Sequence, residues 1–384
     1  MSDAPVTPGT LPAPLLVADA AALEQLVATL VREPAIGVDT ESNSLFAYRE
    51  RVCLIQFSTP TEDFILDPLA FDDLNSLAPL FADPRQQKIF HASEYDVICL
   101  KRDYNFQFSN MFDTMVAART LGWPQLGLAA ILETHYGLRM NKRFQRADWG
   151  LRPLTPELLD YARLDTRFLV RLRDILMAEL AAKGRLLEAQ EEFARLERVA
   201  GAGNGVNPNA FWRINGARDL PPAQAGVLRE LHEYRERQAE RADRPPFKVM
   251  SDQTLLAIAH SGPNSLGDLE RLPGMTAQQI RRHGATLLKA VRRGLGGPPA
   301  RPPHFEREPD SVRERYELLH QWRKRKAQAR GVESDVIISR DALWELARGA
   351  PRTPEALALI ENLGPVRREA YGPEILDVIK GYGE

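Results

Sequence analysis

Two acidic residues, Asp39 and Glu41, stand two positions apart at the end of an apolar segment. Alternate side chains of a β-strand leave the same face, so a strand here would place both carboxylates side by side, with Val38 and Thr40 on the other face. Carboxylates held together repel each other, and one pKa rises unless a cation neutralises them. The pair therefore indicates a platform for a divalent metal ion. The alternative is a strand end with two solvated acids.

Three further residues could complete such a site. Asp96 lies in the first turn of a predicted helix for which Ser93 is the expected N-cap. Tyr161 and Asp165 are four residues apart on a later predicted helix and so share one face. Each also has a simpler interpretation, namely helix-end electrostatics for Asp96 and an ordinary surface pair for the other two. A catalytic role would be favoured only if the fold brings these three residues close to Asp39 and Glu41.

The elements that must position these residues alternate between strands and helices. Apolar runs bounded by turn residues predict strands at 35–42, 51–58, 63–67 and 87–91. Helical spacing and capping signals predict helices at 20–32, 71–81, 93–102 and 127–135. Two further helices are predicted to start at 112 and 156, the last with Thr155 as its N-cap and Pro156 as its first residue. The short connections between the first three strands favour antiparallel pairing, and the mixture indicates an α/β domain.

The composition is that of a globular protein, with 44% hydrophobic and 27% charged residues. No apolar run approaches the roughly 18 residues that span a membrane, and residues 1–14 lack a basic start followed by an apolar core. We therefore expect a cytoplasmic protein without a membrane partner. Cys53 and Cys99 fall in apolar segments, which predicts buried thiols, and no Cys/His cluster indicates zinc.

The formal net charge of −2 is distributed unevenly along the chain. Residues 1–210 carry −7, residues 211–294 carry +5, and residues 301–384 carry 0. The acidic first part suits a cation-binding centre, and the basic middle part suits a polyanion. The alternative for the middle part is a solvated surface with uneven charge.

The C-terminal half contains an internal repeat at a shift of 88 residues. The pairs related by this shift are 232–235 with 320–323, Ser251 with Ser339, Leu255 with Leu343 and Gly284 with Gly372. Two copies of one small helical unit are therefore predicted, separated by the Gly/Pro-rich stretch 294–309.

The acids and the tyrosine resemble, in their order, spacing and predicted elements, the DEDD superfamily of 3′→5′ exonucleases. Tyr161 matches its tyrosine subclass, because the position that the histidine subclass would use holds Asp160. Residues 35–175 further resemble the ribonuclease D family. The matching residues are Phe112-Asp113-Thr114, Lys142, Gln145, Asp148-Trp149 and Arg152-Pro153-Leu154, with Ala147 in place of the family's usual Ser.

The first helical copy resembles the HRDC domain, through Arg244-Pro245-Pro246-Phe247 and Leu272-Pro273-Gly274. The second copy lacks the Pro-Pro-Phe segment, so we expect the same fold with less nucleic-acid contact. The resemblance implies an α/β exonuclease domain with a ribonuclease H-like mixed sheet flanked by helices at 1–205. Two small all-α HRDC-like domains would follow at 211–295 and 308–384.

The resemblance also implies a mechanism. The four acids, Asp39, Glu41, Asp96 and Asp165, would hold two Mg²⁺ or Mn²⁺ ions, with Asp39 bridging; oxygen-only ligands suit such hard cations. One ion would activate water, the other would stabilise the departing 3′ oxygen, and Tyr161 would orient the water. The implied substrate is RNA with a free 3′ end, typically a tRNA precursor, and the products are nucleoside 5′-monophosphates. No obligate protein partner is implied.

Candidates for RNA contact are Lys142, Gln145 and Arg152 before the last motif, and Arg271, Arg281, Arg282, Arg292 and Arg293 in the first copy. Phosphate contacts would give salt-dependent affinity without sequence readout, whereas the alternative is a solvated helix face. Two other functions stay open. One is a DNA-directed 3′→5′ exonuclease of the same fold, because a metal centre does not sense the 2′-hydroxyl. The other is a scaffold that binds RNA without cleaving it.

Overall fold

The computed structural model describes residues 12–381, except 141, 202, 204–206 and 304–306. The chain divides into two compact units. One unit combines residues 1–41, 52–202 and 307–384, and the other combines residues 42–51 and 203–306. None of the helices in the described residues is both long and apolar enough to cross a membrane.

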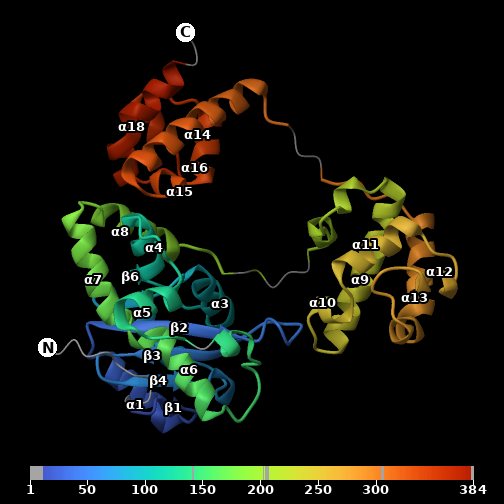
Figure 1. The fold of residues 1–384 in the computed structure, drawn as a ribbon, viewed down its shortest axis with the longest axis horizontal. Coiled ribbons are helices and arrows are strands. Elements are labelled where there is room, and N and C mark those ends of the chain that lie inside the picture. The colour runs from blue at the N-terminus through green and yellow to red at the C-terminus, as the bar shows by residue number, and fades with distance from the viewer. Residues whose placement is uncertain (1–11, 141, 202, 204–206, 304–306, 382–384) are drawn as a thin grey trace. The chain divides into compact units, whose positions relative to one another are not determined.

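A six-stranded mixed sheet forms the centre of the first unit (Figure 1). Its strands are β1 (Leu15–Val17), β2 (Ala35–Ser42), β3 (Val52–Ser58), β4 (Asp63–Leu66), β5 (Gln87–Phe90) and β6 (Met111–Asp113), in the spatial order β1-β4-β3-β2-β5-β6. β3 pairs with β4 in antiparallel register, which confirms the predicted hairpin. The pairs β1–β4, β2–β5 and β5–β6 are parallel.

Helices cover both faces of this sheet, which explains why every residue of β3 is buried. They are α1 (Ala20–Leu30), α2 (Ala78–Ala82), α3 (Glu94–Tyr104), α4 (Thr114–Leu121), α5 (Leu128–Tyr136), α6 (Pro156–Arg167), α7 (Leu169–Ala182) and α8 (Leu186–Glu197). α6 packs on β3 and β4, whereas α7 packs on β5 and α8 on β6. The predicted α/β class with a mixed sheet is confirmed.

Several local predictions are wrong. The helix expected at 71–81 is a 3₁₀ turn, Asn75–Leu77, followed by the short α2, because the Asp73 carboxylate accepts the Asn75 N–H (3.0 Å) and so favours a turn. The helix expected from 112 begins only at Thr114, after β6. The long helix expected after 156 is divided at Phe168 into α6 and α7.

Both copies of the repeat are helical over their described residues. The first copy contains α9 (Pro222–Arg241), α10 (Pro246–Val249), α11 (Asp252–Ser261), α12 (Leu266–Glu270) and α13 (Ala277–Gly296). The second contains α14 (Asp310–Arg330), α15 (Ser334–Ile337), α16 (Arg340–Gly349), α17 (Pro354–Leu357) and α18 (Pro365–Lys380). Each of these helices in the second copy begins 88 residues after its counterpart, so the predicted repeat is confirmed. Each copy has a core of its own.

The segment 42–51, between β2 and β3, groups with the first copy. The Tyr48 N–H donates to the Asp243 carboxylate (3.1 Å), and Arg49 pairs with Glu240 (3.0 Å). The predicted domain 1–205 includes this segment, and the domain bounds stay a prediction.

Candidate active site

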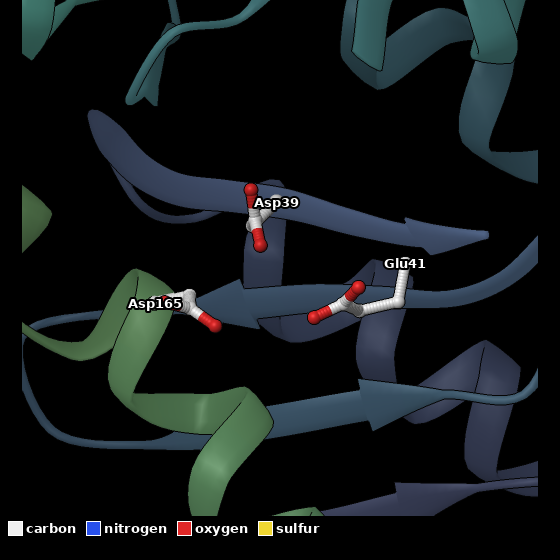
Figure 2. Close-up of side chains that lie close together, drawn as sticks. All are labelled: Asp39, Glu41 and Asp165. Atoms are coloured by element: carbon white, nitrogen blue, oxygen red, sulfur yellow. The ribbon is translucent and has the colours of Figure 1, made fainter. Parts of the chain in front are cut away.

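Three carboxylates from two elements converge beside β2 (Figure 2). Asp39 and Glu41 come from β2, and Asp165 comes from α6. One oxygen of each carboxylate lies within 4.8 Å of the others. Among the described residues, no other three His, Cys, Asp or Glu side chains are arranged to hold a metal ion. The alternation predicted along β2 thus produces the expected pair, and α6 adds a third acid.

The fourth predicted acid, Asp96, lies beside this group of three without belonging to it. Its carboxylate accepts a hydrogen bond from the Thr40 hydroxyl, and the residue is 6% exposed. Its charge raises the pKa values of Asp39 and Asp165, so it acts on the same site. Sequence reasoning missed Thr40, which it treated only as part of the opposite strand face.

Burial and mutual repulsion oppose ionisation of these acids. Burial, followed by the charges of its three acidic neighbours, raises the pKa of Asp39 well above its ordinary value, and burial does the same for Glu41. Burial raises the pKa of Asp96 to about 7, and burial with the charge of Asp96 raises the pKa of Asp165 to about 7. Buried oxygen donors that repel one another in this way are suited to a divalent cation, which would replace their protons.

Tyr161 completes the arrangement. Its ring packs against Phe144 and Trp149, at centroid distances of 5.7 and 6.2 Å, and the residue is 7% exposed. Burial, followed by the charges of Asp165, Glu41 and Asp39, raises the pKa of Tyr161. The phenol therefore keeps its proton at neutral pH and can donate a hydrogen bond next to the carboxylates.

The position of α6 is fixed at both ends. At its start, the predicted cap is confirmed, because the Leu158 N–H donates to the Thr155 side chain (3.4 Å) and Pro156 is the first helical residue. Near its end, the hydroxyl groups of Thr166 and Ser58 lie 2.7 Å apart and join α6 to β3.

The approach of α6 to β2 depends on Gly37, which sequence reasoning missed. A Cβ at this residue would lie only 2.7 Å from the Thr166 carbonyl oxygen. The absence of a side chain therefore lets the helix that carries Asp165 approach the strand that carries Asp39. A glycine inside a buried strand is the sequence signal for such a close backbone contact.

The start of α3, and with it Asp96, is held by Asp113. The Asp113 carboxylate accepts four backbone N–H groups, those of Ala92 (3.1 Å), Ser93 (2.7 Å), Met115 (2.8 Å) and Val116 (3.0 Å). Ser93 precedes α3 as predicted, but its side chain makes no capping hydrogen bond, so the predicted capping role is wrong. The signal that was available for Asp113 is its place directly before a helix.

The RNA-contact candidates before α6 differ in their surroundings. All five N–H groups of Arg152 are used inside the protein, by the Asp67 carboxylate (2.5 and 2.6 Å) and by the carbonyl oxygens (2.8–2.9 Å) of Trp149, Leu151 and Cys53. The Arg152 guanidinium is therefore held by the protein itself, and its contact with RNA stays a prediction. Gln145 is exposed on the 3₁₀ turn Lys142–Arg146, and the side chain of Lys142 lies outside the described part of the chain.

The candidates in the first copy lie at its surface. Arg293 forms an ion pair with Glu230 (2.9 Å). The other four are exposed, namely Arg271, Arg281, Arg282 and Arg292.

Two known protein families match parts of this chain. The family described as 3′-5′ exonuclease matches residues 15–181, and the HRDC domain matches residues 224–291 and 312–379. A ribonuclease D from Gluconacetobacter diazotrophicus is 30% identical, over 73% of this chain and 72% of its own length. The chain belongs to the ribonuclease D family. The family resemblance seen in the sequence is thereby confirmed, and the two HRDC matches are again 88 residues apart.

Two further relatives are similar to this chain, one in structure and one in sequence. The crystal structure of Escherichia coli RNase D, an exoribonuclease involved in structured RNA processing, aligns with a TM-score of 0.71 at 25% identity. The alignment covers 96% of this chain and 99% of that chain. The exosome complex exonuclease RRP6 of Saccharomyces cerevisiae is 29% identical over 73% of this chain, which spans only 40% of the length of that protein.

Proposed function

We propose that this chain is a metal-dependent exonuclease that hydrolyses RNA from the 3′ end. The observation that carries this proposal is the group of three partly buried carboxylates, joined by the buried Asp96 through its charge. Asp39, Glu41, Asp96 and Asp165 would hold two divalent cations, either Mg²⁺ or Mn²⁺. When bound, such cations favour attack of water on a phosphodiester and stabilise charge on the leaving oxygen.

The chain's own groups orient this reaction. The Thr40 hydroxyl holds the Asp96 carboxylate by a hydrogen bond. Gly37, which has no side chain, lets the helix that carries Asp165 lie close to β2. Tyr161 retains its proton, so it would donate a hydrogen bond to the attacking water and would not act as a base. The water oxygen would bond to phosphorus as the bond between phosphorus and the 3′ oxygen breaks. The released product would be a nucleoside 5′-monophosphate.

Support for RNA as the substrate comes from the relatives. The E. coli RNase D is described as an exoribonuclease involved in structured RNA processing. We extend this to precursors of tRNA as the substrate class and to the cytoplasm as the location. Cys53 and Cys99, which are buried and form no disulfide, are consistent with a reducing compartment.

One experiment tests the proposal against its alternatives. The protein and Asp39→Asn are incubated with matched 5′-labelled single-stranded RNA and DNA, in Mg²⁺, Mn²⁺ or chelator. We expect metal-dependent shortening of RNA from the 3′ end that Asp39→Asn abolishes. Shortening that persists in Asp39→Asn would refute the site. Faster shortening of DNA would favour a DNA exonuclease, and no shortening would favour a scaffold.

A further inference from the structure

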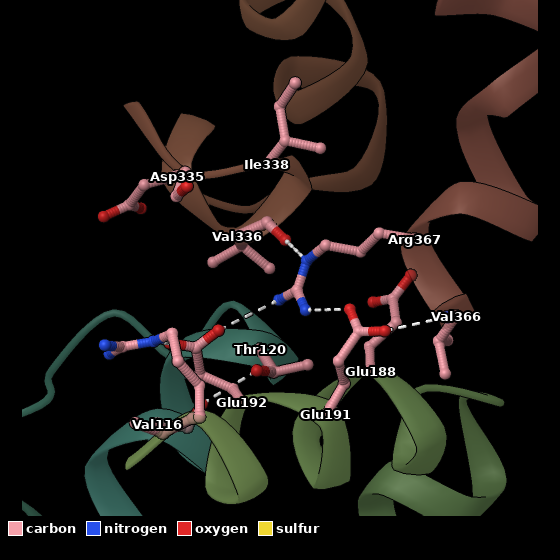
Figure 3. A network of polar contacts seen from close by, with 12 residues as sticks. Val116, Thr120, Glu188, Glu191, Glu192, Asp335, Val336, Ile338, Val366 and Arg367 are labelled. Atoms are coloured by element: carbon pink, nitrogen blue, oxygen red, sulfur yellow. Dashed lines mark hydrogen bonds and ion pairs between the residues drawn. The ribbon is translucent and has the colours of Figure 1, made fainter. Parts of the chain in front are cut away.

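The second copy of the repeat binds a carboxylate at the first turn of its last helix (Figure 3). Glu191 of α8 accepts the Val366 N–H (2.8 Å) and an N–H of Arg367 (2.7 Å). The side chains of Glu191 and Arg367 are 12% and 8% exposed. A Cβ at Gly364 would overlap the Glu191 carboxylate, so the glycine before α18 makes room for it. This end of α18 is therefore an anion site, and the chain itself supplies the anion.

The corresponding place in the first copy is an open pocket. The shift of 88 residues relates Gly364, Val366 and Arg367 to Thr276, Gln278 and Gln279 at the start of α13. A pocket of about 230 Å³ lies there. Its lining includes these three residues and also Gln238, Ala242, Arg244, Lys248, Val249, Arg282 and His283. No aspartate or glutamate is among them, so no carboxylate lining the pocket fills the role of Glu191.

Three cationic side chains, Arg244, Lys248 and Arg282, line this pocket. All three are exposed, and Lys248 lies over the Phe46 ring, 4.1 Å from its centroid, a contact that leaves its positive charge unneutralised. The second copy has Val332, Val336 and Ala370 at the corresponding positions. The positive charge therefore belongs specifically to the copy whose anion site is open.

Two further features suit a polyanion at this pocket. The first turn of the twenty-residue helix α13 contains no acidic residue, so its positive end is not neutralised locally. Phe247, which precedes Lys248 but does not itself line the pocket, is 54% exposed and offers an aromatic face on which a base could stack.

We infer that this pocket binds a phosphodiester group of single-stranded RNA, in the place where the second copy holds the Glu191 carboxylate. The cations and the start of α13 recognise the phosphate and not the base, so the site adds affinity without sequence preference. This inference rests on the proposed function, since it assumes that RNA is the substrate.

The test measures binding of a 5′-labelled single-stranded RNA to the full chain in chelator, by fluorescence anisotropy over a series of salt concentrations. The triple variant Arg244→Gln, Lys248→Gln and Arg282→Gln should bind about tenfold more weakly or worse, because losing even one hydrogen bond from a charged group costs roughly this factor. The slope of log affinity against log salt should fall by about 0.7 for each phosphate that the variant no longer neutralises. Gln279→Glu, which introduces a carboxylate into the pocket, should weaken binding in the same direction.

Lys289→Gln is the matched control, because Lys289 is exposed on the same helix and does not line the pocket. Its affinity should stay within about twofold of wild type, and thermal melting should show every variant folded. An unchanged affinity and salt slope in the triple variant would overturn the inference. So would a competition result in which inorganic phosphate or a nucleoside monophosphate occupies the pocket without displacing RNA, since the ligand would then be a free phosphate.

Failure of the inference is distinguished from failure of the proposed function by a second substrate. We expect metal-dependent hydrolysis of a dinucleotide to require the carboxylate site alone, because the single phosphodiester group of a dinucleotide is the one that is cleaved. Hydrolysis retained at the wild-type rate in the triple variant, together with weakened RNA binding, supports the inference. No hydrolysis by the wild type would instead contradict the proposed function.

Discussion

The Tyr161 hydroxyl can be removed without disturbing the packing around it. Tyr161→Phe keeps the aromatic contacts with Phe144 and Trp149 and removes only the proton donor next to the carboxylates. We expect the rate of RNA hydrolysis to fall roughly 10²-fold or more, in the range of a missing proton-donating group. Calorimetric affinity for Mn²⁺ should change little. Loss of metal binding in this variant would show that Tyr161 shapes the metal site and does not merely orient water.

The raised acid pKa values make metal binding depend on pH. Asp96 and Asp165 have pKa values of about 7, so protons compete with the metal in this range. Affinity for Mg²⁺ should rise between about pH 6 and 8 and then level off. Calorimetric titration at several pH values checks this. Asp165→Asn should show a weaker pH dependence, and a flat profile in the wild type would contradict the assignment.

The same shifts affect stability in the metal-free protein, with a definite sign. A carboxyl whose folded pKa lies above its unfolded value of about 4 stabilises the fold below that value, and this contribution is lost as the pH rises through about 7. The melting temperature of the metal-free protein should therefore fall between about pH 4 and 7 relative to that of Asp165→Asn. An equal pH dependence in the two proteins would contradict the raised pKa.

The directions of individual side chains were predictable where the period of a strand or helix determines them. Asp39 and Glu41 follow the two-residue period of a strand, and Tyr161 and Asp165 follow the turn of a helix. The hydrogen bond from Thr40 to Asp96 was not predictable, because it joins segments 56 residues apart. The partners of Arg152 within the protein were not predictable either, because the sequence does not show which carboxylate or carbonyl oxygen an arginine side chain will contact in the fold.

Among the elements, the contact of β2 with α6 is the one on which the carboxylate group depends. Gly37→Ala would place a methyl group against the Thr166 carbonyl oxygen, which is backbone and cannot move aside freely. We expect a loss of roughly 1–3 kcal/mol of stability and a larger loss of metal affinity, as Asp165 is displaced from Asp39. Urea unfolding and Mn²⁺ calorimetry measure the two effects.

Gly127→Ala provides the matched control, because no atom would lie within 4 Å of the added Cβ and its φ of −72° suits alanine. Equal losses in the two variants would show that the effect of Gly37 is not one of close packing.

Removing the Asp113 carboxylate should destabilise the starts of both α3 and α4. Asp113→Ala leaves four backbone N–H groups without their acceptor at the ends of α3 and α4. The free energy of unfolding should fall by at least about 2 kcal/mol, more than for a single cap. Asp19→Ala is the control, since Asp19 caps α1 with one hydrogen bond, to Ala22 (2.9 Å). A loss no greater than that of the control would contradict the bridging role.

Strands of four or more residues were predictable, whereas the three-residue strands were not. β2 and β3 have seven or eight residues, enough for an apolar run to be recognised, whereas β1 and β6 have three each and show no period. The short strands exist because β4 and β5 offer them parallel partners, a tertiary condition without a local signal.

Over the whole molecule, the second copy of the repeat is joined to α8 by charged side chains that are no more than 19% exposed. Glu188 and Arg330 form two hydrogen bonds of 2.7 and 2.8 Å, beside the pair of Glu191 with Arg367. Removing one partner of a buried pair leaves an uncompensated charge, which costs roughly 3–5 kcal/mol. Arg367→Met should therefore destabilise the full chain strongly in urea, and Glu191→Gln with Arg367→Met should recover part of the loss.

The exposed pair of Arg313 with Asp310 (3.2 Å) is the comparison, and its removal should change stability little. Additive effects of Glu191→Gln and Arg367→Met in the double variant would show that the two side chains do not interact energetically.

At this largest scale the sequence revealed the duplication but not the separate uses of its two copies. The shift of 88 residues and the difference in net charge could be counted directly. The attachment of Arg367 to an acid 176 positions earlier in the chain could not, because it depends on how α8 and α18 meet.

The grouping of residues 42–51 with the first copy has a consequence for shortening the protein. Phe46 and Tyr48 are partly buried against side chains that come from residues 236–248. A chain cut back to the nuclease part would therefore keep an aromatic loop whose covering had been removed, directly after Glu41. Such a truncated enzyme would need polar replacements at both aromatic positions to stay dispersed in solution, even though neither residue belongs to the segment deleted.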